Sequence, residues 1–154
     1  MGYKGEVDVI PNGVDMGKFN IELNRSEREK IRSKMVTTFD LDDTIIITTS
    51  RLVHKNGIDT LIEAMDYLSH DTQLVILAEG PMEKEYKKLA EKIPHDRVHF
   101  LGSVPNDLIP MYLKASDIFV RASRSEGQGI SFIEAMAART PIVATPVGGI
   151  VDFM

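Results

Sequence analysis

The segment DIFVRASRSEGQGISFIEAMAARTPIVATPV, residues 117–147, contains the pattern that decides the fold. Its apolar, β-branched run at 117–123 predicts a strand, and a second such run predicts another strand at 141–147. Between them, apolar residues at helical spacing predict a helix over 130–138, after a loop that contains glycines. A strand, a helix and a strand in this order favour a parallel arrangement.

The same alternation covers the rest of the 154 residues. Further strands are expected at 7–10, 44–50, 73–78 and 97–102. Further helices are expected at 25–36, 57–68, 83–93 and 106–115. The strand at 44–50 is apolar on both faces, as is usual for a parallel strand covered by helices. We therefore predict an α/β fold, a Rossmann-like, doubly wound, mainly parallel sheet of about six strands in a single domain over residues 1–154.

The composition is that of an ordinary globular protein, with 43% hydrophobic and 27% charged residues. The net charge of -5 argues against a nucleic-acid partner or an anionic membrane surface. Since the chain has no cysteine, disulfides, thiol catalysis and cysteine-bound zinc are excluded. No apolar run approaches the roughly 20 residues of a membrane helix, and the start lacks the apolar core of a signal peptide. We expect a cytoplasmic protein without a transmembrane segment.

The loops that follow the expected strands differ from those that follow the helices. Most of the glycines and unusual charged residues lie after strands, in PNGVD, RLVHKNG, EGP, GSVPND, SRSEGQG and GGI. The loops after helices, such as SHDT, PHD and ART, are plainer. In open α/β sheets, ligands bind at the carboxyl ends of the strands. One edge of the sheet is therefore predicted to bind a ligand.

Two glycines, Gly127 and Gly129, directly precede the helix at 130–138. Glycine lets a backbone approach a ligand closely, and the free N–H groups at a helix start favour a phosphate. Glu126 enters this turn from the strand side, so its carboxylate would project beside a phosphate. Taken alone, Glu126 could instead be an acid that stabilises the helix N-terminus.

Glu134 lies on the i, i+3, i+4, i+7 stripe of the same helix, with Ile130, Ile133 and Ala137. A carboxylate on that stripe should be partly buried and should need hydrogen-bond donors, which sugar hydroxyls supply. Taken alone, it could also bond a lysine or a backbone group. Two hydroxyl-binding carboxylates around one diphosphate-binding turn match a nucleotide sugar, so the combination favours a ligand.

Arg51 directly follows an apolar strand, where its guanidinium could reach a phosphate with a forked pair of donors. Lys55 follows in the loop that leads into the next helix, and either residue alone could equally be a solvated surface cation. The four histidines show no metal-ligand spacing, and the chain contains no P-loop and no GxGxxG motif. No bound metal and no cofactor are expected.

Several motifs, in this order, resemble the carboxyl-terminal, donor-binding domain of retaining glycosyltransferases with the GT-B fold, family GT4. VIPNGVDMGKF is similar to the linker that enters this domain, and SRLVHKNGIDTLIEAM to its phosphate-contacting strand, loop and helix. EGQGISFIEAMA resembles the two-glutamate motif of the family, and TPVGGIVDF the turn that follows it. The resemblance covers nearly the whole chain.

The resemblance implies a role for each matching residue. Glu126 would bind hydroxyls of the donor sugar, and Arg51 would neutralise the diphosphate of the leaving nucleotide; these two are the candidate catalytic residues. Glu134 would bind the ribose hydroxyls. The remaining donor-binding candidates are Lys55, Asn56, Ser103, Val104, Gly127, Gly129 and Ile130. The implied donor is a nucleotide-diphosphate sugar, bound without a metal, and the implied acceptor is a hydroxyl group.

Two departures from the family pattern bear on function. The family has a phosphate-binding lysine where this chain has Asn56, and here the lysine stands one position earlier, at Lys55. The acceptor-binding amino-terminal domain and the last helices of the GT-B fold are absent from the sequence. We therefore expect a partial enzyme that binds donor weakly, transfers little or no sugar alone and acts with its amino-terminal domain, for which the family also implies possible peripheral membrane association.

Two other functions fit the same fold. A nucleotide-sugar 2-epimerase shares the architecture but not the glutamate pair together with the linker motif. A non-catalytic nucleotide-binding or receiver-like module would require an acidic cluster after the first strand and an aspartate after the third, where the chain has Glu79. Both fit the sequence less well than a glycosyltransferase.

Overall fold

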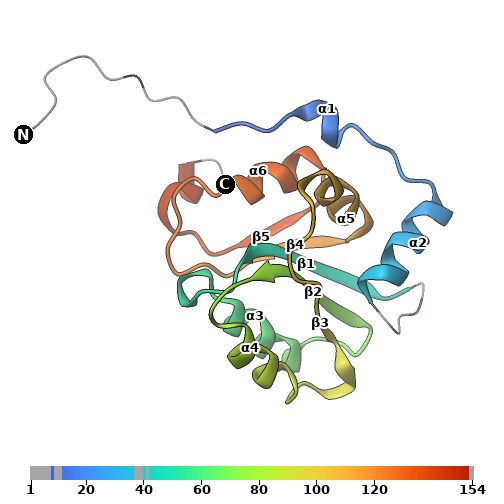
Figure 1. Cartoon of the computed structure of the whole chain (residues 1–154), viewed down its shortest axis with the longest axis vertical. Helices are drawn as coiled ribbons and strands as arrows, with labels where there is room; N and C mark the ends of the chain where they lie inside the picture. Colours follow the sequence, from blue (N-terminus) through green and yellow to red (C-terminus); the bar gives the residue numbers. More distant parts are fainter. Residues whose placement is uncertain (1–7, 9–11, 37–39, 41, 153–154) are drawn as a thin grey trace, which may run out of the picture.

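The computed structural model describes residues 8, 12–36, 40 and 42–152. These residues form a five-stranded parallel sheet in the order β3-β2-β1-β4-β5 (Figure 1). The strands are β1 (Thr44–Arg51), β2 (Thr72–Glu79), β3 (Val98–Phe100), β4 (Ile118–Arg121) and β5 (Ile142–Ala144). The predicted fold class is thereby confirmed. The strand expected at 7–10 lies outside the described residues, apart from Asp8.

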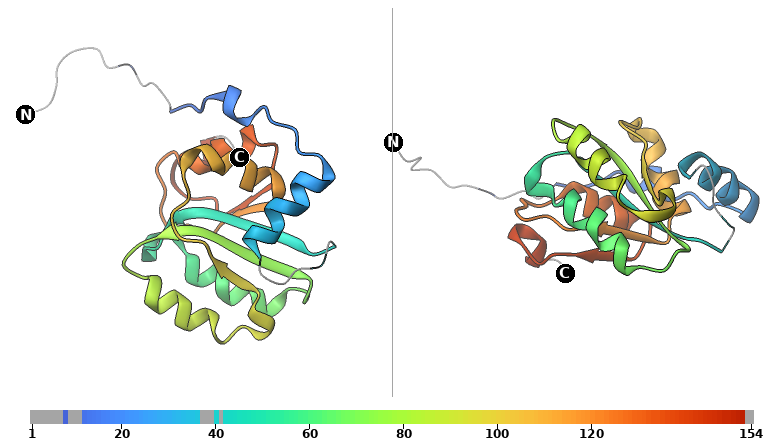
Figure 2. Two further views of the ribbon diagram at one scale, coloured as in Figure 1. Left: turned by 45° about the vertical axis from the view of Figure 1, so that its right-hand side comes forward. Right: turned by 90° about the horizontal axis from the view of Figure 1, so that it is seen from below.

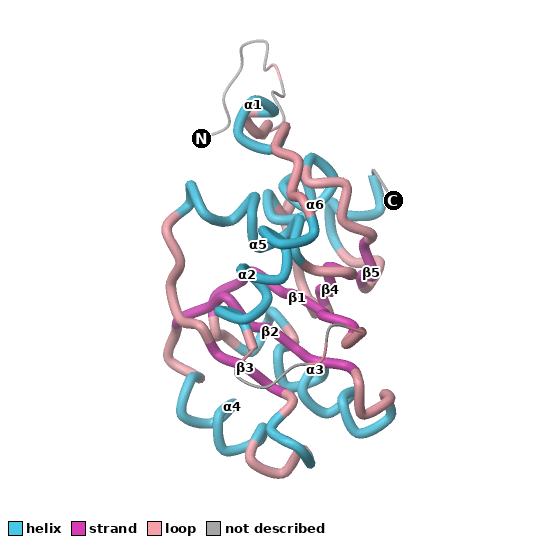
Figure 3. The backbone as a smooth tube through the Cα atoms, turned by 90° about the vertical axis from the view of Figure 1, so that its right-hand side faces the viewer, coloured by secondary structure: helices cyan, strands magenta, loops and turns pink. Residues whose placement is uncertain are grey.

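Helices cover both faces of the sheet (Figures 1 and 2). The α-helices are α1 (Met16–Phe19), α2 (Arg25–Met35), α3 (Ile58–Ala64), α4 (Glu83–Ala90), α5 (Ile109–Ala115) and α6 (Ile130–Ala137). Short 3-10 turns are η1 (His54–Asn56), η2 (Met65–Tyr67), η3 (Pro94–Asp96), η4 (Asn106–Leu108) and η5 (Gly148–Asp152). Figure 3 shows α3 and α4 below the sheet and α5, α6 and α2 above it.

Each face of the sheet buries its own apolar cluster, because successive side chains of a strand point to opposite faces. Ile45 and Ile47 of β1 join the cluster under α5 and α6, and Ile46 packs against the cluster on α3 and α4. Phe119 of β4 meets Phe132 of α6 edge-to-face, with ring centroids 5.7 Å apart. Burying each side chain of this size contributes roughly 1.5–3 kcal/mol, so both helical layers are held mainly by packing.

The helices begin and end where local chemistry satisfies their backbone. Asn24 and Glu27 form a reciprocal capping box at the start of α2. Pro110 lies in the first turn of α5, where its missing N–H removes no helical bond. The helix expected over 57–68 changes to 3-10 geometry after Ala64, and the buried Arg97 donates to the carbonyls of Met65 and Leu68 beyond it.

The strand order places a topological switch point between β1 and β4. From β1 the chain moves outward to β2 and β3, then returns to β4 on the other side of β1 and continues to β5. At a switch point the loops after neighbouring strands diverge, which opens a crevice at their carboxyl ends. Arg51 is the last residue of β1 and Arg121 the last residue of β4, so the loops that follow these two strands begin side by side at the switch point.

Candidate functional site

A cleft of about 1160 Å³ lies at the carboxyl ends of β1, β2 and β4, against the start of α6. We call it the switch-point cleft. All the candidate donor-binding residues except Gly127 line it: Arg51, Lys55, Asn56, Ser103, Val104, Glu126, Gly129, Ile130 and Glu134. The structure thus brings together residues that are up to 83 positions apart in the sequence (Arg51 to Glu134).

Glu126 is held in place by two neighbours at the wall of this cleft. Its Oε1 accepts hydrogen bonds from Arg121 Nη2 and from Ser123 Oγ, the latter at 3.1 Å. The side chains of Arg121 and Glu126 are each 9% exposed, so the ion pair is almost fully buried. Only Oε1 takes these bonds, which leaves Oε2 available to a hydroxyl in the cleft.

Arg121 is a cleft residue that the sequence analysis missed. Its guanidinium also donates to Thr49 O at 2.6 Å, Ser131 Oγ at 2.9 Å and Ser123 Oγ at 3.1 Å. Burial lowers the pKa of Arg121, and the nearby Glu126 carboxylate acts in the opposite direction. The available signal was its position: like Arg51, Arg121 is an arginine at the end of an apolar strand on the ligand edge.

Of the two glycines in the turn before α6, Gly129 lies against the cleft as expected, whereas Gly127 does not. Gly129 has a φ of 66°, and a Cβ there would lie 2.6 Å from the Phe132 ring, so only glycine fits. Among the described residues, no side chain caps the N-terminus of α6, whose first residues Ile130 and Ser131 line the cleft. The first amides of a helix have no partner within the helix, so a ligand in the cleft can bind there. Gly127 does not line the cleft; its carbonyl accepts a bond from Gly149 N at 3.1 Å.

Gln128, between the two glycines, ties this turn to the segment before α1. Its side-chain Oε1 accepts from Asn12 N at 2.8 Å, and its Nε2 donates to Asn12 O at 3.2 Å. The two bonds use the backbone of Asn12, so they fix the position of the chain irrespective of the side chain at that residue. Two hydrogen bonds therefore connect this turn to the segment that precedes α1.

Glu134 is half-buried beside the cleft, and its side-chain carboxylate receives no hydrogen bond or ion pair from the described residues. Burial raises the pKa of its carboxyl above the ordinary value of 4.5. The partial burial of Glu134 agrees with the sequence-based expectation. Of the predicted stripe, Ala137 is buried whereas Ile130 is 49% exposed, and Phe132 and Ala135, which lie outside the stripe, are fully buried. The stripe with Glu134 borders the cleft, and its carboxylate requires donors that a ligand can supply.

Cationic side chains line another part of the same cleft. Arg51 and Lys55 are exposed, and neither side chain is paired with any residue that the structure describes. Asn56, which stands where the family pattern has a lysine, is 4% exposed, and its Nδ2 donates to Arg51 O at 2.8 Å. Asn56 thus shapes the turn that presents Arg51 and Lys55.

The loops after β1 and β4 are locked together. Arg124 forms two bonds with Asp59, at 2.8 and 2.9 Å, and its backbone N donates to Lys55 O at 2.7 Å. Burial tends to raise the pKa of Asp59, but hydrogen bonds from Arg124 and from the backbone outweigh burial and lower it. Gly57 lies directly against Ala122 of the other loop, with a φ of 64°.

Glu79, at the end of β2, is a second cleft residue that was not singled out from the sequence. Its Oε1 accepts from Ser103 N at 3.1 Å, so it orients the loop that contains Ser103 and Val104. Gly102 has a φ of 68° in the same loop. A carboxylate that holds a loop backbone leaves the remaining backbone groups of that loop to a ligand.

The described part of the chain contains no cluster of three or more His, Cys, Asp or Glu residues arranged to hold a metal ion. The described residues that line the cleft instead offer carboxylates, the paired cation Arg121 and two cations, Arg51 and Lys55, whose side chains are unpaired. Among the described residues, no helix combines the length and apolar character needed to cross a bilayer.

A parallel sheet with a cleft at its switch point, two carboxylates around a glycine turn and unpaired cations define a Rossmann-like α/β domain whose cleft suits phosphate and hydroxyl groups. Residues 29–154 match the family model of glycosyl transferases group 1, and the chain belongs to this family. It is 35% identical over 152 residues to an uncharacterized glycosyltransferase of Methanocaldococcus jannaschii. That match covers 97% of the chain but 38% of the relative, so the chain spans well under half of the relative's length.

Solved structures show the same fold. Anabaena HepE, in a complex with UDP-glucose, superposes with a TM-score of 0.84 and 25% identity over 96% of the chain and 40% of HepE. The carboxyl-terminal domain of LpcC, a group 1 glycosyl transferase of Francisella tularensis, superposes with a TM-score of 0.72 and 26% identity. That match covers 89% of the chain and 72% of the LpcC domain. The chain is therefore similar to the carboxyl-terminal half of GT-B glycosyltransferases.

Proposed function

We propose that this chain is the donor-binding domain of a retaining, metal-independent glycosyltransferase that transfers a sugar from a nucleotide diphosphate to a hydroxyl acceptor. The observation that carries the proposal is the arrangement of Glu126 and Glu134, which stand on either side of the uncapped start of α6 in one cleft. Carboxylates accept hydrogen bonds from hydroxyls, and helix N-termini bind phosphate. A ligand with two hydroxyl-rich rings joined by a diphosphate satisfies all three features.

Each candidate residue has a defined part in this scheme. Glu126 accepts a bond from a donor-sugar hydroxyl through its free Oε2, and Glu134 accepts from the ribose hydroxyls. Arg51 and Lys55 balance the diphosphate charge, which increases as the sugar–phosphate bond breaks and the nucleotide leaves. Gly129 and Ile130 present amides, and the loop at Ser103 and Val104 contacts the base. Lys55 supplies the charge that Asn56 lacks.

The identity of the donor can be proposed from structural relatives. HepE was solved with UDP, with UDP and glucose, and with UDP-glucose, which makes UDP-glucose the first donor to test. Catalysis by the whole enzyme requires an acceptor-binding amino-terminal domain that closes on the donor. We propose that the 154-residue chain alone binds donor weakly and transfers little sugar.

Thermal unfolding in the presence of UDP, GDP, ADP and their glucose or mannose conjugates tests the proposal. A ligand at about 100 times its dissociation constant adds roughly 2.7 kcal/mol of stability, which raises the melting temperature measurably. We expect one base to stand out. Glu126→Gln should weaken binding of the nucleotide sugar by more than tenfold and binding of the free nucleotide much less. A cooperative melt that no nucleotide or nucleotide sugar shifts would refute donor binding by this chain.

Nucleotide affinity should also fall as the pH decreases through the raised pKa of Glu134, because the protonated carboxyl loses its capacity to accept from both ribose hydroxyls. The free chain should respond oppositely. The fold favours the protonated form, so the contribution of Glu134 to stability is lost as the pH rises above 4.5 through the raised pKa. Melting curves with and without nucleotide between pH 4.5 and 8 measure both trends, and Glu134→Gln should remove both. A Gln variant with the wild-type pH profile would contradict the assigned role.

A further inference from the structure

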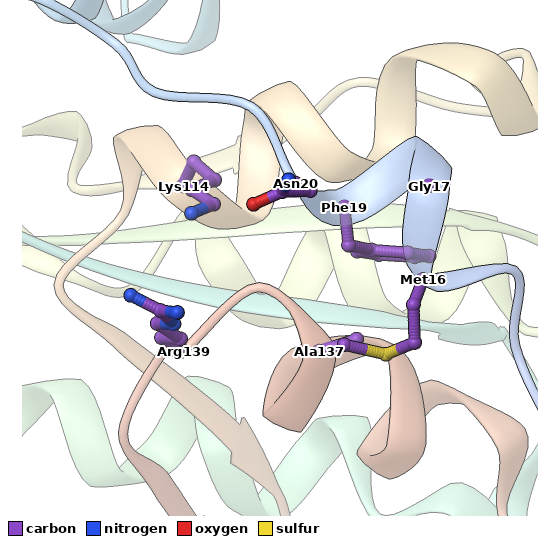
Figure 4. A pocket seen from close by; sticks show the side chains of 7 residues that line it. All are labelled: Met16, Gly17, Phe19, Asn20, Lys114, Ala137 and Arg139. Atoms are coloured by element: carbon purple, nitrogen blue, oxygen red, sulfur yellow. The ribbon is translucent and has the colours of Figure 1, made fainter.

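A second cavity, of about 250 Å³, lies beneath α1, at the opposite end of α6 from the switch-point cleft. We call it the α1 cavity; none of the residues that line it lines the switch-point cleft. Its lining residues are Met16, Gly17, Phe19, Asn20, Lys114, Ala137 and Arg139. Figure 4 shows the polar ends of Lys114, Asn20 and Arg139 gathered on one side, with Met16, Phe19 and Ala137 on the other.

The polar side of this cavity has an excess of positive charge. The side chain of Lys114 is only 13% exposed, and its nearest carboxylate is Glu22 Oε1, 4.0 Å away on a side chain that is 85% exposed. The guanidinium of Arg139 has no hydrogen bond or ion pair with any residue in the described ranges. None of the described residues that line the cavity is acidic. A mostly buried ammonium without a close partner is costly, so the site favours an anion.

The backbone at Arg139 supplies an independent reason to expect a function. Arg139 follows α6 with a φ of 59°, and the bonds from Arg139 N to Met136 O and from Thr140 N to Ala135 O form a Schellman motif. Glycine is the usual residue at this left-handed position, because any Cβ there is sterically disfavoured. The chain has an arginine where glycine would fit without strain, and its side chain lies at the α1 cavity.

We propose that the α1 cavity is an anion site for a phosphate group, bound between Arg139 and Lys114 with Asn20 as an additional hydrogen-bond donor. A guanidinium binds phosphate through a forked pair of N–H groups, and an ammonium adds a point charge. The bound phosphate would join the end of α1 to the carboxyl ends of α5 and α6. The phosphate belongs either to a small soluble molecule or to a lipid headgroup.

Thermal unfolding in increasing inorganic phosphate, with ionic strength held constant by sodium chloride, tests the site. Wild type should show a saturable rise in melting temperature. Arg139→Gly and Lys114→Met should weaken the apparent affinity at least tenfold. Because Arg139→Gly relieves the left-handed strain, it should melt higher than wild type without phosphate, so its loss of response cannot arise from misfolding. Lys18→Met, which removes a nearby cation outside the cavity, is the matched control and should respond like wild type.

A double variant, Arg51→Gln with Lys55→Gln, separates this site from the switch-point cleft and should keep the phosphate response. Co-sedimentation with phosphatidylglycerol vesicles, compared with phosphatidylcholine vesicles, distinguishes the sources: binding that Arg139→Gly abolishes, without a response to free phosphate, identifies a lipid phosphate. The proposal is overturned if wild type responds to neither probe, if Arg139→Gly and Lys114→Met respond as wild type does, or if only the Arg51 and Lys55 changes remove the response.

Discussion

Arg121→Met is expected to lower the free energy of unfolding by about 3–5 kcal/mol, because it leaves the Glu126 carboxylate buried without its charged partner. The same change should release Glu126 from its position in the cleft. Binding of a nucleotide sugar should therefore weaken more than binding of the free nucleotide, the pattern expected for Glu126→Gln. Urea unfolding measures the first effect, and calorimetric titration with UDP-glucose and UDP measures the second.

Two further variants isolate the cause. Arg121→Met combined with Glu126→Leu replaces the buried ion pair by apolar side chains and should recover most of the lost stability, but not the sugar affinity. Arg25→Met, the control, removes an arginine whose side chain is 84% exposed and forms one surface ion pair, so it should cost no more than about 1 kcal/mol. An Arg121→Met protein as stable as wild type would mean that the ion pair does not hold this wall of the cleft.

Gly57→Ala should have the second largest effect, a loss of roughly 2–5 kcal/mol from left-handed strain and overpacking together. A Cβ at this residue would lie 1.9 Å from Ala122 O and 2.7 Å from Ala122 C, so backbone rather than a flexible side chain would have to move. The loops after β1 and β4 would separate, and nucleotide affinity should fall with stability. Urea unfolding and nucleotide titration of the variant measure both.

Gly13→Ala is the matched control, because a Cβ there has no atom within 4 Å. It should leave stability within about 0.5 kcal/mol of wild type, as most surface changes do. A Gly57→Ala protein that equals Gly13→Ala in stability and nucleotide affinity would show that the contact with Ala122 can relax at little cost.

The sequence was sufficient for the fold because the apolar runs that become strands are separated by amphipathic helices. β1 and β2 were predicted within a residue or two of their observed bounds. β3, β4 and β5 were predicted three or four residues too long, because apolar residues such as Leu101 and Val147 lie beyond the last paired residue of their strand. Strand pairing, rather than composition, decides where an edge strand ends, and pairing cannot be read from a local pattern.

Several of the residues that line the cleft were singled out from the sequence, and others were not. Gly129 was identified because it directly precedes a predicted helix, and Glu134 because it is an acid on an otherwise apolar helical stripe. Arg121 was missed because its role depends on Ser123, Ser131 and the carbonyl of Thr49, which come together only after β4 pairs with β1. Arg139 was missed because a left-handed arginine has no sequence signature. The contacts of Arg121 and the backbone conformation of Arg139 are determined by the tertiary structure and not by the local sequence.

The pairing of Gln128 with Asn12 has a mechanical consequence. The side-chain amide of Gln128 bonds only to the main-chain N and O of Asn12, so these bonds do not depend on the side chain at position 12. They do couple the position of the backbone at residue 12 to that of Gln128. The point of attachment lies between the two glycines of the turn that precedes α6. A displacement of the backbone at residue 12 would therefore shift that turn directly through these two hydrogen bonds, without any movement of the sheet.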